Sequence, residues 1–411
     1  MHKLLSFLGT RDYTPVYYTL NGKRSSKTSF FQRALLEFMR DDSPDEVIIF
    51  LTDQARKQNW KKLKEELEEL GVKSKGVQIS GIGREEELWK DFGRILECLD
   101  NGDEIDFDIT YSFRYQPIMA MLVIHFASVV KDVQIRGIYY GNFEEKVGDE
   151  APVLNLRNFV DMQEWITNVY AFVESGRAES LSKWVEEKKG LMSQSSLSPR
   201  VEAAEELVKK WNQLAENLQT CRGPKISRSA KEAQIALQQV RKEEPYPTFV
   251  PLYALFDDLE NQLEKMAIGD DIEANLETVQ WCIDHGLIQQ AYTLLTEVVI
   301  TAFCWAEGRN PIKKKKRGEI TWHINKAIEV LKGQKSFDCF TPKQQDVIRR
   351  MLKHSELLIA YQRIADLRHD INHAGWRENS KEAGIFLKGL KENYLIIVNY
   401  IRQLRQEVKQ V

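Results

Sequence analysis

The sequence predicts an α/β domain followed by a region that is helical to the end of the chain. Over roughly the first 160 residues, short runs rich in β-branched residues alternate with amphipathic helical patterns, which is typical of a parallel sheet. After Asn155 the strand pattern disappears, and helical patterns rich in Glu, Lys and Gln replace it. A chain of 411 residues accommodates two or three hydrophobic cores.

Within the first domain, residues 1–160, predicted strands and helices alternate along the chain as βαβ units require. The predicted strands are Leu4–Leu8, Val47–Thr52, Gly76–Ile79, Ile105–Thr110 and Val133–Tyr140. The predicted helices are Ser29–Arg40, Gln54–Leu70, Glu85–Leu99 and Gln116–Val130. Asn21-Gly22, between VYYTL and KRSS, predicts a hairpin turn added to this frame.

The rest of the chain divides into a helical connector, residues 161–275, and a helical domain, residues 276–411. The polar segment SQSSLSPR (193–200) and the proline cluster PYPTFVP (245–251) interrupt the connector. From residue 253 onward every segment has a helical pattern except the loop GRNPIKKKKRGE (308–319).

Cysteine usage and hydropathy favour a cytoplasmic protein. The five cysteines are scattered and form no CxxC or CxxH pair, which favours reduced thiols over disulfides or a zinc site. They are Cys98, Cys221, Cys282, Cys304 and Cys339. The apolar run at the N-terminus ends too early for a signal peptide, and no segment has the ~20 apolar residues that cross a bilayer.

The charge is distributed unevenly along the chain. Residues 276–411 hold 22 Lys and Arg against 15 Asp and Glu, a balance of +7. Because the net charge of the whole chain is −3, the preceding residues carry −10. A basic C-terminal third on an acidic body fits a protein that handles a polyanion at that end. The alternative is a chance composition of solvated helices.

Two predicted strand ends carry residues suited to a phosphate or a ribose. In an open parallel sheet, ligands bind beyond the carboxyl ends of the strands. The first strand runs into Gly9-Thr10-Arg11-Asp12-Tyr13, and the fourth into Asp108-Ile109-Thr110-Tyr111-Ser112-Phe113-Arg114. Neither segment is a GxGxxG or GxxxxGK[ST] motif, and hydroxyls and glycines of this kind also serve ordinary turns and caps.

The segments LLSFLGTRDYTPVYYTLNGK, FDITYSFRYQP and GIYYGNFE resemble the CARF sensor domain of CRISPR-associated ribonucleases. This resemblance implies a Rossmann-like fold that pairs as a homodimer and binds a cyclic oligoadenylate, here expected to be the tetramer, across its two-fold axis. By the same resemblance, the residues lining that pocket are Gly9, Thr10, Tyr13, Thr110, Ser112 and Arg114.

Near the C-terminus, the run Asp366-Leu367-Arg368-His369-Asp370-Ile371-Asn372-His373 concentrates titratable and cationic groups. Histidine transfers protons at neutral pH, and arginine offers a fixed charge to a phosphorane-like transition state. Two alternatives remain open. His369 and His373 have the spacing of zinc ligands but lack the glutamate of HExxH, and a helix C-terminus attracts basic residues through its dipole.

Arg368 and His373 form an Arg-x4-His motif that resembles the active site of HEPN ribonucleases, and Gln289 to Glu297 (QQAYTLLTE) resembles the helix that precedes it. The resemblance implies metal-independent cleavage of RNA by Arg368 and His373, with His369 and Asn372 beside them. The two main residues lie about 140° apart around an ideal helix. One helix therefore aims them at different sides, which favours a composite site made by two subunits.

Other basic and aromatic residues near the motif have simpler interpretations. The run Lys313–Lys316 with Arg317 offers a guide for RNA phosphates, but a solvated basic loop is the favoured interpretation. Trp305 and Trp322 flank it within helical patterns, which favours core packing over base stacking.

Together these features predict an allosteric endoribonuclease of type III CRISPR immunity that cuts single-stranded RNA and leaves a 2′,3′-cyclic phosphate. The competing hypothesis is a non-catalytic CARF-type sensor whose helical domain binds a partner or nucleic acid. A Rossmann-like metabolic enzyme is a third hypothesis, against which the missing glycine fingerprint counts.

Overall fold

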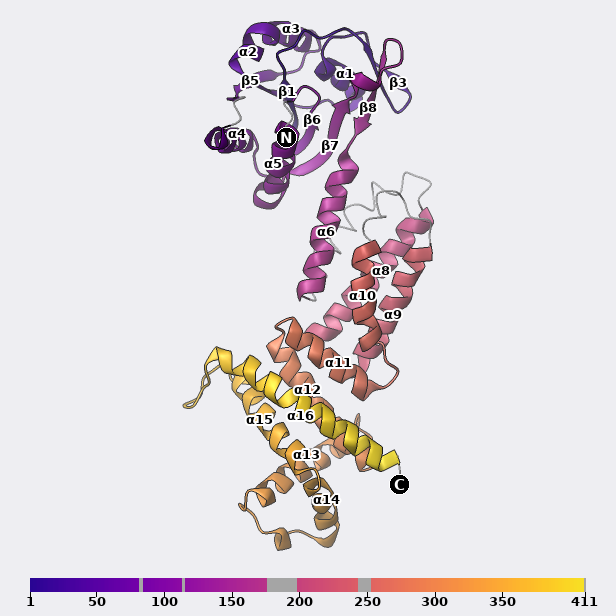
Figure 1. Ribbon diagram of the computed structural model, residues 1–411, viewed down its shortest axis with the longest axis vertical. Coiled ribbons are helices and arrows are strands. Elements are labelled where there is room, and N and C mark those ends of the chain that lie inside the picture. The colour runs from indigo at the N-terminus through magenta and orange to yellow at the C-terminus, as the bar shows by residue number, and fades with distance from the viewer. Residues whose placement is uncertain (81–83, 113–114, 176–197, 243–252, 410–411) are drawn as a thin grey trace. The chain divides into compact units, whose positions relative to one another are not determined.

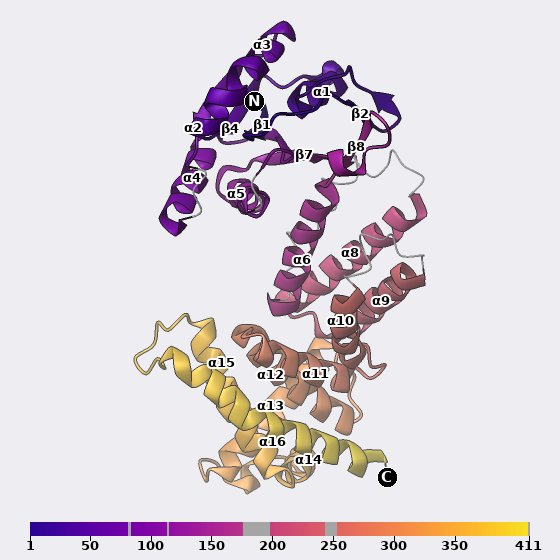
Figure 2. The ribbon, with the colours of Figure 1, turned by 45° about the horizontal axis from the view of Figure 1, so that its top comes forward.

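The computed structural model describes residues 1–80, 84–112, 115–175, 198–242 and 253–409 (Figures 1 and 2). The chain divides into two compact units, residues 1–164 and 165–411, with the boundary inside helix α6 (Arg157–Ser175). Arg114, the proline cluster at 245–251 and residues 193–197 of the polar segment lie outside the described residues.

The first unit contains one sheet, whose strands within the described residues are ordered β3-β2-β8-β7-β6-β1-β4-β5. They are β1 (His2–Leu8), β2 (Tyr17–Leu20), β3 (Lys23–Arg24), β4 (Glu46–Leu51), β5 (Ser74–Gln78), β6 (Glu104–Asp108), β7 (Gln134–Gly141) and β8 (Glu150–Asn155). The run β7-β6-β1-β4-β5 is parallel throughout. This arrangement confirms the predicted α/β fold.

A hairpin and an unpredicted strand extend the sheet at one edge. β2 and β3 pair antiparallel through Asn21 and Gly22, whose positive φ angles of 49° and 76° are those of a tight hairpin turn. β8 was not predicted, because Pro152 lacks the N–H that a strand interior normally donates. It nevertheless lies between β2 and β7, parallel to the former and antiparallel to the latter.

Helices cover both faces of this sheet (Figure 2). They are α1 (Phe31–Phe38), α2 (Asp53–Ala55), η2 (Arg56–Trp60), α3 (Lys61–Glu69), α4 (Glu85–Glu97) and α5 (Gln116–Lys131), with short turns η1 (Arg40–Asp42) and η3 (Phe143–Glu145). Successive residues of a strand face opposite sides. Accordingly Leu5 and Phe7 pack with α4 and α5, whereas Leu4 and Leu8 pack with α1 and α3.

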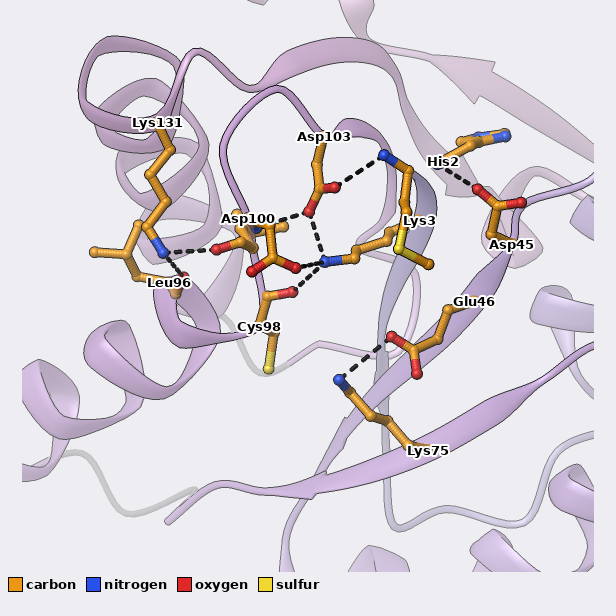
Figure 3. Close-up of polar contacts among 12 residues, drawn as sticks. His2, Lys3, Asp45, Glu46, Lys75, Leu96, Cys98, Asp100, Asp103 and Lys131 are labelled. Atoms are coloured by element: carbon orange, nitrogen blue, oxygen red, sulfur yellow. Dashed lines mark hydrogen bonds and ion pairs between the residues drawn. The ribbon is translucent and has the colours of Figure 1, made fainter.

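At the amino end of the central strand β1, ion pairs connect the strand to the residues that precede β6 (Figure 3). The ammonium of Lys3, which is buried, lies 2.6 Å from a carboxylate oxygen of Asp103 and 2.8 Å from one of Asp100. The N-terminal amine of Met1 pairs with the other oxygen of Asp103. Removing one partner of such a buried pair typically costs about 3–5 kcal/mol of folding free energy, so these ion pairs stabilise the fold of the domain.

The second unit is helical throughout its described residues, as predicted. After α6 come α8 (Ser198–Gln219), α9 (Gly223–Lys242), α10 (Tyr253–Met266), α11 (Asp271–Asp284), α12 (Ile288–Ala306), α13 (Lys314–Leu331), η5 (Phe337–Cys339), α14 (Pro342–Leu352), α15 (Ser355–Asn372) and α16 (Ala383–Lys409). One hydrophobic core connects them, and Trp211, Tyr292 and Phe303 are its largest fully buried side chains. No helix among the described residues is long and apolar enough to cross a membrane.

The predicted loop at 308–319 is wrong in its second half, because α13 begins at Lys314. Lysines in a first helical turn oppose the helix dipole, which is why the sequence favours a loop. Arg317 overrides this preference through hydrogen bonds to the Glu297 carboxylate and the Thr301 hydroxyl. Further loops separate α13 from α14 and α15 from α16, where continuous helix was predicted.

Candidate functional site

The loops after β1 and β6 lie side by side, because the two strands are parallel neighbours with Ser6 opposite Asp108. The rings of Tyr13 and Tyr111 join the loops by stacking with their centroids 4.0 Å apart. The Tyr111 hydroxyl donates to the Ser29 carbonyl at 2.9 Å, which ties both loops to the start of α1. The structure thus brings together the two segments that the sequence singled out.

Gly9 and Asn59 hold the first loop in place. A Cβ atom on Gly9 would lie 2.6 Å from the Tyr13 hydroxyl oxygen, so only glycine lets Tyr13 fold back over the loop. That hydroxyl is buried without a hydrogen-bond partner, and burial raises its pKa. Asn59, which is buried in the turn η2 that follows β4, donates to the carbonyls of Gly9 and Arg11 at 3.0 Å each.

Beneath the loops, Ser6, Gln32 and Asp108 form a buried polar cluster. Each of the three is fully buried. Ser6 donates to one Asp108 oxygen at 2.7 Å and accepts from the Gln32 amide at 2.9 Å, and the Thr110 N–H donates to the other Asp108 oxygen. Burial raises the pKa of the Asp108 carboxyl to about 6, because these hydrogen bonds offset only part of the lost hydration.

The predicted ligand residues differ in what their side chains do. The Thr110 hydroxyl oxygen accepts from the Gly141 N–H, and the Ser112 hydroxyl donates to the Ile109 carbonyl, so both are engaged within the sheet edge. Thr10 is half-buried. The backbone N–H groups of Thr10 and its neighbours Arg11 and Asp12 find no acceptor among the residues that the structure describes. This loop therefore presents consecutive free donors, as an anion-binding loop does.

At the C-terminal end of α15, the predicted catalytic residues are separated. His373 caps the helix, and its ring meets that of His369 edge to face at 4.3 Å. Asn372 and both histidines are exposed, whereas Arg368 is only 27% exposed and turns toward α12. Within the described residues no contact joins the Arg368 guanidinium to the His373 ring.

Glu297 on α12 anchors two arginines through its carboxylate. One oxygen accepts from Arg368 Nη1 at 3.1 Å, and the other accepts from Arg317 Nε at 3.1 Å and Nη2 at 2.6 Å. The Arg368 Nε is buried without a partner, so the position of the guanidinium is set mainly by its contact with Glu297. No role for Glu297 was predicted from the sequence, where it stands out only as the last residue of QQAYTLLTE.

Asp370, also missed in the sequence, fixes the turn that follows His373. Its carboxylate, 3% exposed, accepts from the Lys381 N–H at 2.8 Å, and its carbonyl accepts from the N–H groups of His373 and Gly375. No three His, Cys, Asp or Glu side chains gather as a metal-binding group in the part of the chain that is described.

A parallel sheet whose carboxyl-end loops carry free amides and buried polar groups defines a ligand-binding α/β domain. Residues 3–144 match the family described as the CARF domain of the CRISPR system endoribonuclease Csx1. Residues 161–272 match the second domain of CRISPR-associated protein MJ1674. The chain therefore contains a CARF domain, and both of its matched regions resemble domains of CRISPR-associated proteins.

One curated relative matches more than half of the chain. CRISPR-associated protein MJ1674 of Methanocaldococcus jannaschii is 24% identical over 241 residues, which are 57% of this chain. The matched segment spans only 34% of that relative's length.

Proposed function

We propose that this protein is an endoribonuclease that a cyclic oligoadenylate activates through the CARF domain and that cuts single-stranded RNA without a metal ion. The observation that carries the proposal is the pair Arg368 and His373 at the end of α15, with Arg368 braced by Glu297. A Csx1-type CARF domain, whose family is described as an endoribonuclease, precedes this pair in the same chain. The proposed domains are 1–160 for the sensor, 161–275 for the connector and 276–411 for the HEPN-like nuclease.

The activator site is proposed at the loops after β1 and β6. Free N–H groups of Thr10, Arg11 and Asp12 suit the phosphates of a cyclic oligoadenylate, which we expect to be the tetramer. Gly9, Tyr13, Thr110 and Ser112 form the loop frame around them, and Arg114 belongs to the same segment of sequence. A ligand here displaces water from backbone donors that the protein itself leaves unused.

The proposed reaction is attack by the 2′-oxygen of a nucleotide on its own 3′-phosphate. A new P–O2′ bond forms, the P–O5′ bond breaks, and the products are a 2′,3′-cyclic phosphate and a 5′-hydroxyl. One group takes the proton of the 2′-hydroxyl and another gives a proton to the leaving 5′-oxygen, and His373 is the proposed proton carrier. Arg368 neutralises the phosphorane-like transition state, with His369 and Asn372 lining the same helix end.

A homodimer is proposed because a single chain supplies only part of each proposed site. On α5, which starts directly after the second ligand loop, Ile118, Leu122, Phe126 and Val129 recur along one stripe and are 44–75% exposed. An apolar stripe of this size on a soluble surface usually marks an interface. A second copy covering it would also bring the ligand loops of two chains together.

The experiment that tests the function is RNA cleavage in EDTA with cyclic tri-, tetra- and hexa-adenylate added separately. We expect cleavage with the tetramer and a 2′,3′-cyclic phosphate in the products by mass spectrometry. Activator binding without cleavage under any condition would favour the non-catalytic sensor instead. Cleavage that disappears in EDTA would favour a metal-dependent nuclease.

A further inference from the structure

The indole of Trp376 is 91% exposed, more than any other large hydrophobic side chain among the described residues. Exposing a tryptophan to water in this way forgoes the stabilisation that its burial gives. Trp305 and Trp322, which the sequence singled out, are only 36% and 38% exposed, and Trp322 packs edge-on against Phe340. Trp376 therefore differs in kind from the tryptophans near the basic run.

The position of Trp376 is fixed relative to His373. The backbone N–H of Trp376 donates to the His373 carbonyl at 2.9 Å, so both residues belong to one turn. Ala374 and Gly375 between them are both left-handed, with φ of 52° and 76°. A left-handed alanine is uncommon, and such strain persists where the surrounding structure holds it. Here the buried Asp370 does so, through the bonds of its carbonyl and carboxylate to the two ends of the loop.

The surroundings of the indole suit a nucleobase better than a protein partner. Residues 372–385 are all exposed, and the run RENSKE that follows Trp376 is polar. A protein interface normally places its aromatic anchors in an apolar core of substantial area. An isolated aromatic ring beside a cation, here Arg377, is typical of proteins that stack the bases of single-stranded RNA.

We infer that Trp376 is a substrate-positioning residue that stacks on a base of the RNA next to the phosphate being cut. This inference rests on the proposed ribonuclease function and adds to it the way in which the substrate is held. Stacking on a residue of the His373 turn sets the distance between the base and the imidazole. It also explains a requirement for single strands, since a paired base is not free to stack on the indole.

The test measures binding of a labelled single-stranded RNA to the full-length His373→Ala protein, which is expected not to cut it. Adding Trp376→Ala should weaken RNA binding about tenfold, as the loss of one stacked base does, while Trp376→Phe should retain most of the affinity. Leu395→Ala, which removes another exposed apolar side chain (63%) from the same unit, is the matched control and should bind as before.

A second measurement separates stacking from a general structural effect. In the cleaving protein, Trp376→Ala should raise KM more than it lowers kcat. With an RNA that is abasic beside the mapped cleavage position, the two proteins should have the same KM. A difference that persists with the abasic RNA would overturn the inference.

The remaining outcomes distinguish the inference from the function beneath it. If the wild-type protein cuts RNA and Trp376→Ala binds RNA with the same affinity, the inference about Trp376 is wrong but the proposed function stands. If Trp376→Ala instead turns dimers into monomers in sedimentation, a second copy of the chain covers the indole, and the inference also fails. Wild-type protein that neither binds nor cuts RNA would overturn the proposed function itself.

Discussion

The loop site of the CARF domain and the end of α15 differ in how their polar side chains are buried and bonded. Around Asp108 the polar side chains are fully buried and bonded to one another, and the free donors are backbone amides. At the end of α15 the histidines are exposed, and Arg368 is bonded to Glu297 rather than to His373. In the first site, the polar groups that hold the ligand loops are bonded to one another within one chain. In the second, the two proposed catalytic residues are held apart, as a site shared between two subunits requires.

The largest effect expected from this contrast is at the helix end. His373→Ala should lower RNA cleavage by about 10²–10⁴-fold, since general acid–base groups contribute that much to rate. Activator binding, measured by calorimetry, should not change, because the loops after β1 and β6 are intact. His323→Ala, on α13, is a matched control. Full activity of His373→Ala would contradict the assignment.

Asp108 tests the claim that the loop site depends on buried groups. Its folded pKa of about 6 lies above the usual 3.8, so ionisation opposes folding. The penalty is absent below pH 4, grows as pH rises to about 6 and is then constant. It amounts to about 3 kcal/mol by linkage.

Asp108→Asn removes this titration. The unfolding free energy of the variant minus that of wild type should therefore increase by up to about 3 kcal/mol between pH 4 and pH 7. Urea unfolding, with hydrogen exchange in β1 and β6 to assign the transition, measures it. A difference that is constant with pH would show that Asp108 ionises freely.

Glu297 tests whether the position of Arg368 matters for cleavage. Glu297→Gln weakens the hold on both Arg368 and Arg317, and we expect kcat to fall about tenfold with little change in KM, because charge-assisted hydrogen bonds are about twice as strong as neutral ones. Asp is too short to restore the contact, so Glu297→Asp should resemble Glu297→Gln. Unchanged kcat in both variants would mean that cleavage does not depend on the contact between Arg368 and Glu297.

Gly9 and Tyr13 offer a paired test of the loop. Gly9→Ala places a methyl group 2.6 Å from the Tyr13 hydroxyl, so the activator concentration for half-maximal cleavage should rise several-fold. Tyr13→Phe removes that oxygen, and the double variant should recover most of the sensitivity. Tyr13→Phe alone should be neutral or slightly stabilising, because the hydroxyl is buried without a partner. A double variant as impaired as Gly9→Ala would locate the clash elsewhere.

The smallest departure from wild type is expected in mixed dimers. Combining Arg368→Ala and His373→Ala subunits leaves one intact arginine and one intact histidine, on different chains. Activity of purified, differently tagged mixed dimers should return to about half of wild type, while each parent dimer stays inactive. Mixed dimers that remain inactive would show that the pair works within one chain or that all four side chains are needed.

Much of this protein is determined by its sequence. Nearly continuous apolar runs in β1 and β4 indicate a sheet buried on both faces. Asn21-Gly22 indicates the hairpin, and the order of strands and helices places polar loops at one end of the sheet. The prediction that Arg368 and His373 point apart also follows from helix geometry alone. These features depend on residues close together in the chain, whose spacing the sequence states directly.

The tertiary structure decided which distant residues meet. Glu297 lies 71 residues from Arg368, and no local pattern indicates that its carboxylate accepts from both Arg368 and Arg317. The same holds for Asn59 and the carbonyl of Gly9, and for Asp108 and the hydroxyl of Ser6, 102 residues away. The burial that raises the pKa of Asp108 depends on layers packed from both sides of the sheet. Such contacts exist only after the chain has folded, because the free energy of packing, and not local propensity, selects them.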